Sequence, residues 1–311
     1  MLSINRYRFR LLARDTIRFA SFPGSALRGL FGHSLKDTVC VTRLEHCENC
    51  MLRHDCVYSY LFETQATLDN GQDAPHPLIF DVRHAAQETA PHESLFVEAT
   101  LVGEAGKHLP YLIEAWRRAG KRGLGRQRAK FDLVSVDVYD FTTHVWLPVS
   151  IDGTSTNVAQ KPFDISSDTQ VNMTESVVIE LLTPYRSKRN GRLVTPESFT
   201  ASAFVISLLR RIDRLRQLHE RERSPINREL FIVASKLTMP DAELIWTDWV
   251  RYSSRQHTHM NLGGVIGSFA IDGAGLPLVW TALQLGQWIQ AGKNTLFGLG
   301  CYRLKSRTTS A

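Results

Sequence analysis

The sequence lacks a long apolar run. Its longest apolar segment, residues 275–292, is interrupted by Gln and Thr and is too short to span a bilayer. The first ten residues carry three arginines and no apolar stretch of the kind found in a secretory signal. We therefore expect a cytoplasmic protein with no membrane partner.

The chain also lacks a strong excess of charge of one sign. It has 37 basic and 31 acidic residues, for a net charge of +6, and it is 43% hydrophobic and 22% charged. This composition is typical of a soluble globular protein, and the small positive excess is compatible with a polyanionic partner without requiring one. A length of 311 residues is enough for two domains.

Cysteine is scarce outside one short stretch. Four of the five cysteines fall within residues 40–56, with the spacing C-x6-C-x2-C-x5-C: Cys40, Cys47, Cys50 and Cys56. In a reducing compartment such a group is more typical of metal ligands than of disulfides. Structural zinc sites usually pair two C-x2-4-C knuckles, whereas iron–sulfur clusters often use one compact run of cysteines.

This cysteine spacing resembles the cluster loop of the endonuclease III and adenine-glycosylase family of DNA repair enzymes, over about twenty residues only. We predict a structural [4Fe-4S] cluster, with zinc as the alternative and a metal-free loop as the third possibility. In a zinc site, His46 or His54 could replace one cysteine. A site whose ligands all come from the protein is closed, so we expect no catalytic role for the metal.

Apolar periodicity predicts strands and helices in the first half. In residues 4–13 three arginines alternate with apolar residues, which indicates a strand with one basic face, either solvated or facing RNA. A helix with an apolar stripe is predicted to start at Pro23–Ser25, directly before the cysteines. Residues 65–94 are polar and Pro-rich, and we predict a loop there with one short strand at 78–82.

A pattern of strand, helix, glycine-rich loop and strand occurs twice, over residues 93–140 and 261–306. Each helix follows a Leu-Pro pair, and we predict that the two helices end at Gly120 and Gly292. Between the copies we predict a strand, a basic turn, and a helix with Thr195 as its N-cap.

Each half therefore has the order β-α-…-β-α-β, which predicts an α+β fold of tandem ferredoxin-like domains with a Cys-rich metal-binding insertion. We place the first domain at residues 1–150, with the insertion at about 38–95, and the second at 151–311, with its Gly-rich loop. The polar segment 150–172 is the predicted boundary.

Several segments carry a resemblance to a known family. "GGVIGSFAIDG" and "AGKNTLFGLGCYRL", together with "PGSALRGLFGHSLK", "VYSYLFE" and "RYSSRQ", resemble the RAMP superfamily. Within it they resemble the CRISPR repeat-processing endoribonucleases, in particular a subgroup with a four-cysteine insertion. The resemblance implies tandem ferredoxin-like (RRM/RAMP-like) domains and a nuclease of antiviral defence, a hydrolase by class.

The same resemblance implies an RNA substrate and a reaction. The enzyme would bind the repeat stem-loop of a CRISPR transcript and cut it without a metal ion. The 2′-hydroxyl beside the scissile phosphate would attack, leaving a 2′,3′-cyclic phosphate. CRISPR repeat RNA is then the expected partner, with other CRISPR effector or adaptation subunits as further partners.

Two alternatives remain open from the sequence. One is a non-catalytic RAMP subunit that holds guide RNA in a CRISPR effector complex. The other is a cluster-bearing DNA repair enzyme, which would have a helix-hairpin-helix segment before the cysteines. Because one predicted strand and one predicted helix precede Cys40, this second alternative is disfavoured.

Cleavage of this kind needs a base, an acid and a cation that stabilises the phosphorane charge. The resemblance implies a histidine near the first helix, and His33 lies there off the apolar stripe. We predict His33 for proton transfer and Arg28 for the phosphorane, against the plainer interpretations of a surface histidine and an ion-paired arginine. Alternative or assisting groups are His54, His46, Tyr58 and Tyr60.

Predicted RNA contacts gather in the two glycine loops and the basic turn. Glycines let a backbone approach phosphates closely, and nearby cations add attraction, although "KNTLF" in the second loop contains no glycine. A solubilising role is the alternative for the basic turn. The predicted RNA-binding residues are Lys121, Arg122, Arg126, Arg128, Arg186, Lys188, Arg189, Lys293, Gly298 and Gly300.

Overall fold

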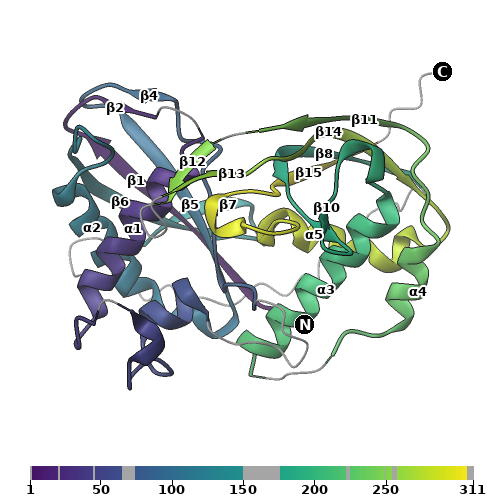
Figure 1. Ribbon diagram of the computed structural model, residues 1–311, viewed down its shortest axis with the longest axis horizontal. Coiled ribbons are helices and arrows are strands. Elements are labelled where there is room, and N and C mark those ends of the chain that lie inside the picture. The colour runs from purple at the N-terminus through teal and green to yellow at the C-terminus, as the bar shows by residue number, and fades with distance from the viewer. Residues whose placement is uncertain are drawn as a thin grey trace. The chain divides into compact units, whose positions relative to one another are not determined.

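A computed structural model describes residues 2–19, 22–44, 46–64, 74–149, 176–221, 225–248, 250–253 and 258–306. The chain divides into two compact units (Figure 1). The first unit comprises Leu2–Phe163 with Leu218–Glu222, and the second comprises Asp164–Gln217 with Arg223–Ala311. The predicted boundary between residues 150 and 151 lies outside the described residues and stays a prediction.

The first unit is a mixed α/β structure around one antiparallel sheet. Its strands are β1 (Ile4–Ala13), β2 (Ile17–Arg18), β3 (Leu78–Asp81), β4 (Glu88–Thr89), β5 (Ser94–Val102), β6 (Phe131–Asp140) and β7 (Val145–Val149). Its helices are α1 (Gly24–Val39) and α2 (Leu109–Arg122), with 3-10 turns at Cys47–Asn49 and Gly103–His108 and a π-helical turn at Ser59–Glu63. The sheet order is β3-β5-β1-β6-β7, and β2 pairs with β4 separately.

The strand predicted at 78–82 is β3, and it belongs to the main sheet because it pairs with β5. The range predicted for the Cys-rich insertion, about 38–95, therefore includes a strand of this sheet. The succession β1, α1, β3, β5, α2, β6 follows the order that the sequence predicted for each half.

The alternation in β1 separates an apolar face from a basic one. Tyr7, Phe9 and Leu11 are fully buried. The ring centroid of Phe9 lies 6.0 Å from that of Trp116 in α2, so the helices cover the apolar face of the sheet (Figure 1). The arginines of β1 point to the opposite face, because successive side chains of a strand alternate.

The prediction that the first repeated helix ends at Gly120 is wrong. Helix α2 continues to Arg122, and Gly123, with φ of 87°, follows it. A side chain at Gly120 would clash with the carbonyl oxygen of Phe131, so this glycine allows α2 to lie close against β6. From the sequence alone, a glycine that allows close packing cannot be told from a glycine that ends a helix.

The second unit has the same succession of elements. Its strands are β8 (Ser176–Tyr185), β9 (Lys188–Arg189), β10 (Arg192–Leu193), β11 (Ala242–Thr247), β12 (Val250–Ser253), β13 (Thr258–Asn261), β14 (Gly264–Asp272) and β15 (Tyr302–Ser306). Its helices are α3 (Ala201–His219), α4 (Glu229–Ser235) and α5 (Leu276–Ile289), with 3-10 turns at Pro196–Ser198 and Thr295–Phe297. The main sheet has the order β11-β14-β8-β15 and is antiparallel.

Two helix ends in this unit differ from the predictions. Thr195 caps a separate 3-10 turn, with its N–H donating to Ser198 Oγ at 2.9 Å, and α3 begins only at Ala201. Helix α5 ends at Ile289, before Gly292, because Gln290 already has a φ of 60°. Among the described residues, no helix is long and apolar enough to cross a membrane.

Candidate functional site

His33 lies on an exposed stripe of α1. The stripe contains Gly29 and Asp37 one turn to either side, since residues four apart share a helix face. A Cβ atom at Gly29 would meet nothing within 4 Å. Asp37 Oδ2 accepts a hydrogen bond from Arg122 Nη1 at 2.5 Å. The structure therefore brings Arg122 to the helix face that carries the predicted catalytic histidine, and that face is open.

The end of α2 and the loop that follows it present three further cations on the surface. The loop is closed by a hydrogen bond from the Leu124 N–H to the Ala129 carbonyl at 2.8 Å. Lys121, Arg126 and Arg128 are all exposed there. With Arg122, these four predicted RNA-binding residues form one basic edge of the first unit, which we call the α2 loop edge.

Arg28 lies on another side of α1 from His33. Its guanidinium carbon is 4.4 Å from the ring centroid of Phe62, which belongs to the π-helical turn after the cysteines. A side chain at Gly32 would clash with the same ring. Lys36 Nζ lies 5.9 Å from the ring centroid of Tyr58. The structure thus packs Arg28 against an aromatic ring and does not bring it beside His33.

His54 is exposed within the cysteine loop. Its Nε2 accepts a hydrogen bond from Arg53 Nε at 3.0 Å, which is a contact between neighbours in the sequence. Tyr60 is more enclosed. Its ring centroid is 5.6 Å from that of His108 and 5.5 Å from that of His219, and its hydroxyl has no hydrogen-bond partner among the described residues.

Burial raises the pKa of Tyr60 and lowers the pKa of His108. His219 Nε2 donates to the carbonyl of Pro75, with 2.9 Å between the two atoms. Sequence reasoning missed both histidines of this cluster, because neither belongs to a motif and one of them is contributed by the end of α3. The edge-to-face contacts of these rings in a partly buried place indicate packing rather than a surface for phosphate.

The four cysteines are half-buried, and each is a free thiol. They line a single cavity of about 370 Å³ next to the end of α1. Burial raises the pKa of Cys47, and a hydrogen bond with Thr42 lowers the pKa of Cys50. In the part of the chain that the structure describes, no three or more His, Cys, Asp or Glu side chains converge as ligands of a single ion.

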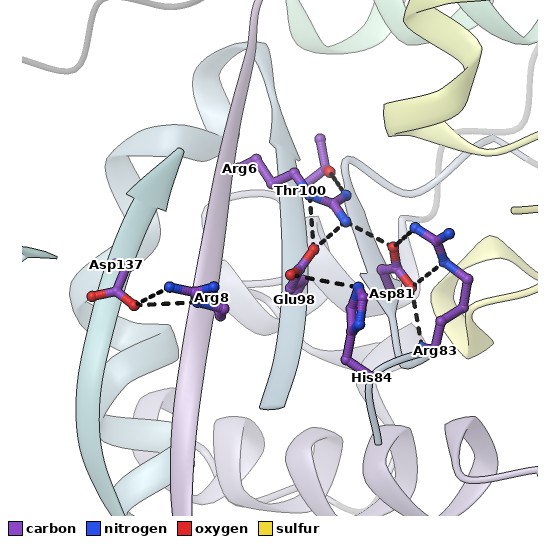
Figure 2. A network of polar contacts seen from close by, with 8 residues as sticks. All are labelled: Arg6, Arg8, Asp81, Arg83, His84, Glu98, Thr100 and Asp137. Carbon is purple, nitrogen blue, oxygen red and sulfur yellow. Dashed lines mark hydrogen bonds and ion pairs between the residues drawn. The ribbon is translucent and has the colours of Figure 1, made fainter. Parts of the chain in front are cut away.

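The basic face of β1 is largely neutralised by carboxylates (Figure 2). Arg6 is only 3% exposed, and its Nη2 lies 2.7 Å from Asp81 Oδ2 and also contacts Glu98. Arg83 pairs with the same carboxylate of Asp81 at 2.6 Å. Burial alone would raise the pKa of Asp81, but the two guanidinium groups outweigh it and lower the pKa well below its usual range.

Arg8 and Arg10 lie further along the same face. Arg8 Nη2 is 3.1 Å from Asp137 Oδ2, and its guanidinium carbon is 4.4 Å from the ring centroid of Trp146. Arg10 Nε donates to Ser94 Oγ at 2.8 Å and is exposed. The sequence left open whether this face is solvated or faces RNA. Neither interpretation describes Arg6, which belongs to a buried ion-pair network.

In the second unit, the structure brings the basic turn and the second glycine loop together. The N–H of Lys293 donates to the carbonyl of Arg186 at 2.7 Å. Arg186 Nη1 in turn donates to the carbonyl of Gly263 at 2.7 Å, and burial lowers the pKa of Arg186. Lys293 is exposed, as are three cations of the β9–β10 hairpin: Lys188, Arg189 and Arg192.

Gly298 and Gly300 are buried. The N–H of Gly300 donates to the carbonyl of Pro184 at 3.0 Å, and a side chain at Gly300 would clash with the carbonyl oxygen of Ala291. Both glycines have a φ near 80°, which other residues rarely adopt. Backbone conformation and close packing are therefore sufficient to explain why Gly298 and Gly300 are glycines. Lys293, in contrast, is exposed on this loop.

Arg211 of α3 supports this loop from inside the unit. It is 9% exposed, and its Nη2 donates to the carbonyl of Ile289 at 3.0 Å and to Thr295 Oγ1 at 2.9 Å. Its Nε donates to the carbonyl of Gln290 at 3.1 Å, and burial lowers the pKa of Arg211 to about 10. Sequence reasoning missed this residue, since α3 is rich in arginine and nothing marks the one that turns inward.

Two protein-family models match the chain. AF_1859_N, described as an N-terminal domain, matches residues 2–162, and CRISPR_Cas6, described as CRISPR-associated endoribonuclease Cas6, matches residues 179–302. Among curated proteins, an uncharacterized protein of Archaeoglobus fulgidus is 24% identical over 300 residues, which are 92% of each chain.

Solved structures share the mixed α/β fold with antiparallel sheets. A Cas6 product complex aligns with a TM-score of 0.59 and 14% identity over 97% of this chain and 99% of that chain. A Thermus thermophilus Cas6 aligns with a TM-score of 0.56 and 14% identity over 98% and 99% of the two chains. A chain of a partial Cas6-RT-Cas1–Cas2 complex aligns with a TM-score of 0.60 and 13% identity over all of this chain and 47% of that one.

Proposed function

Because this chain belongs to the AF_1859_N family through residues 2–162 and matches the Cas6 endoribonuclease model over residues 179–302, we propose that it binds CRISPR repeat RNA and cuts it. The match of the second unit to an endoribonuclease family is the observation that carries this proposal. We infer further that both units are ferredoxin-like, as the shared succession of elements and the matching order of their main strands support.

The exposed basic groups suit RNA. The α2 loop edge gathers Lys121, Arg122, Arg126 and Arg128 on one unit, and the β9–β10 hairpin and Lys293 gather cations on the other. Stem-loop RNA is recognised mainly through its shape and phosphates, and exposed cations on short, fixed loops provide such contacts at low entropic cost. The ion-paired arginines of β1 are less suited to this role.

The reaction that we propose is a metal-independent transesterification. The 2′-oxygen attacks the adjacent phosphorus, and the bond from phosphorus to the 5′-oxygen breaks. The 2′-hydroxyl proton goes to a base, and the leaving 5′-oxygen takes a proton from an acid, so that a 2′,3′-cyclic phosphate and a 5′-hydroxyl form. This reaction needs a positioned histidine and a nearby cation, with no other reactant.

His33 is the proposed proton-transfer residue in this chain. It is exposed on α1, and the open space at Gly29 lets a phosphate backbone approach it. Arg122, held at Asp37 one turn along the same stripe, is better placed than Arg28 to meet the phosphate charge. The Arg28 guanidinium is held against Phe62, which supports a packing role for it. His54 stays an alternative proton-transfer group.

A wider assembly is a further part of the proposal. One structural neighbour is a chain of a Cas6-RT-Cas1–Cas2 complex, and this chain spans 47% of it. We propose that the protein can work beside CRISPR adaptation or effector subunits. Co-purification of the tagged chain with proteins of its own locus, before and after RNase treatment, tests this: recovery of no CRISPR subunit under either condition would contradict it.

The cleavage proposal is tested with a labelled stem-loop repeat RNA from the protein's own locus, incubated in excess EDTA. We expect one discrete cut by the wild type and a rate lower by roughly 10²–10⁴-fold for His33→Ala, the usual contribution of a general acid or base. The matched control is His92→Asn, at an exposed turn with a φ of 68° that Asn tolerates. It should cut at the wild-type rate.

Three outcomes separate the possibilities. If the His33→Ala variant cuts as fast as the wild type, His33 has no part in the mechanism, and His54 becomes the candidate for proton transfer. Tight binding without cutting would favour the guide-holding RAMP subunit. Failure to bind repeat RNA at all would overturn the proposed function.

A further inference from the structure

The cysteine loop surrounds a hollow. The four thiols line a cavity of about 370 Å³. The other residues that line it are both apolar and charged, and they include Leu44, Leu52, Lys36, Arg53 and Asp55. One water needs only about 10–15 Å³ of such volume. All of these residues belong to the first unit, so the cavity is formed within that unit alone.

A single zinc ion would require a different arrangement. Four thiolates at a Zn–S distance of about 2.3 Å would place their sulfur atoms within about 4 Å of one another. Among the described residues no such convergent group occurs. Four thiols that line one cavity of about 370 Å³ match a larger inorganic core instead, in which each thiolate binds a different metal atom.

We propose that Cys40, Cys47, Cys50 and Cys56 hold a four-iron, four-sulfide cluster in this cavity, and that the cluster fixes the turn Ser59–Glu63 on α1. The thiols are half-buried, and no disulfide joins any of them. This site is separate from the proposed RNA reaction, which needs no metal.

The route from the cluster to α1 is short. The carbonyl of Cys56 accepts a hydrogen bond from the N–H of Tyr60 at 2.9 Å, so the last of the four cysteines is bonded to the first part of the π-helical turn. That turn places the ring of Phe62 against Gly32 and 4.4 Å from the Arg28 guanidinium. A cluster bound to Cys56 would therefore also hold in place the aromatic side chain that covers one side of α1, Phe62.

Elemental analysis of the full chain, purified without oxygen, tests the assignment. We expect about four iron atoms and about four sulfide ions per chain, with broad visible absorption that bleaches on reduction. One zinc per chain and no iron would overturn the cluster assignment. A folded chain without iron or zinc would overturn the metal site altogether. RNA cutting plays no part in this readout, so its failure and that of the proposed function are distinguishable.

Variants test the ligands and the turn. Cys47→Ala and Cys56→Ala should lose most of the iron, whereas Cys301→Ala, which removes the fifth cysteine from a buried site in the second unit, should keep it. Amide hydrogen exchange of residues 59–63 should accelerate at least tenfold in the two ligand variants and stay unchanged in the control. Full iron content in both ligand variants, or unchanged exchange after iron loss, would overturn the corresponding half of the proposal.

Discussion

Arg211 makes several buried polar contacts at the end of α5 in the second unit. Its described partners, Ile289, Gln290 and Thr295, are all uncharged, so the cation is stabilised by carbonyl dipoles at the end of α5. Such an arrangement fixes the glycine loop relative to α5. It also means that a change at Arg211 leaves several buried acceptors without a donor.

We predict that Arg211→Met lowers the free energy of unfolding of the full chain by about 2–4 kcal/mol, through loss of charge-assisted hydrogen bonds. Arg210→Met is the matched control, because Arg210 is exposed on the same helix, and it should change stability by less than about 0.5 kcal/mol. Urea unfolding of both variants measures this. Equal effects of the two substitutions would contradict the role assigned to Arg211.

Asp81 gives a pH dependence with a definite sign. Its pKa is depressed in the folded protein by Arg6 and Arg83, against the effect of burial, while the unfolded value is about 3.9. The ionised carboxylate therefore stabilises the fold above about pH 4, and this stabilisation is lost as the pH falls below that value.

We predict that protection of the β1 and β5 amides from hydrogen exchange falls below pH 4 in the wild type and falls less steeply in Asp81→Asn. Asp132→Asn, which removes a carboxylate from an exposed ion pair with Arg14, should behave as the wild type does. Parallel pH profiles for the wild type and the Asp81 variant would show that the buried network does not carry the pH dependence.

At the scale of elements, two helical glycines, Gly29 of α1 and Gly120 of α2, have opposite roles. Gly120 allows α2 to approach β6, whereas a Cβ atom added at Gly29 would meet nothing within 4 Å. We predict that Gly120→Ala destabilises the protein by about 1–3 kcal/mol through overpacking, whereas Gly29→Ala stabilises it by about 0.5–1 kcal/mol through helix propensity. Thermal unfolding of both variants decides this, and the same sign for both would contradict the packing described here.

The sequence predicted most elements because their apolar periodicity comes from burial on one face, as in β1 and α2. It missed β11, whose side chains are mostly exposed or half-exposed and which therefore lacks a strong alternating pattern. Helix ends were misplaced at Gly120 and Thr195, since a glycine and a cap residue look alike whether they serve a helix end or a tertiary contact.

In the candidate site, too, the sequence predicted some features and missed others. The exposure of His33 follows from its place off the apolar stripe of its own helix, and the sequence was sufficient to predict it. The partner of Arg28 was not predictable, because Phe62 comes from a turn beyond the cysteine loop. The contact between Arg186 and Lys293 likewise joins segments far apart in the chain.

At the scale of the whole molecule, the net charge of +6 matters less than where unpaired cations lie. We predict that the double variant Lys121→Ala, Arg126→Ala binds repeat RNA more weakly. The slope of the logarithm of its binding constant against the logarithm of the salt concentration should be shallower by about 0.7–0.9 for each phosphate that the variant no longer neutralises. The control, Arg14→Ala with Arg18→Ala, removes two exposed but ion-paired cations and should keep the wild-type slope. Filter-binding titrations at several salt concentrations give both slopes.

We propose that this chain cuts repeat RNA through the RNA's own 2′-hydroxyl. The most direct measurement compares, in excess EDTA, an unmodified repeat RNA with one that carries a single 2′-deoxy nucleotide before the cut. We predict that both RNAs bind equally, that the unmodified RNA yields a 2′,3′-cyclic phosphate, and that the deoxy RNA stays whole. Binding of both without any cut, or a cut in the deoxy RNA at the same place, would contradict it.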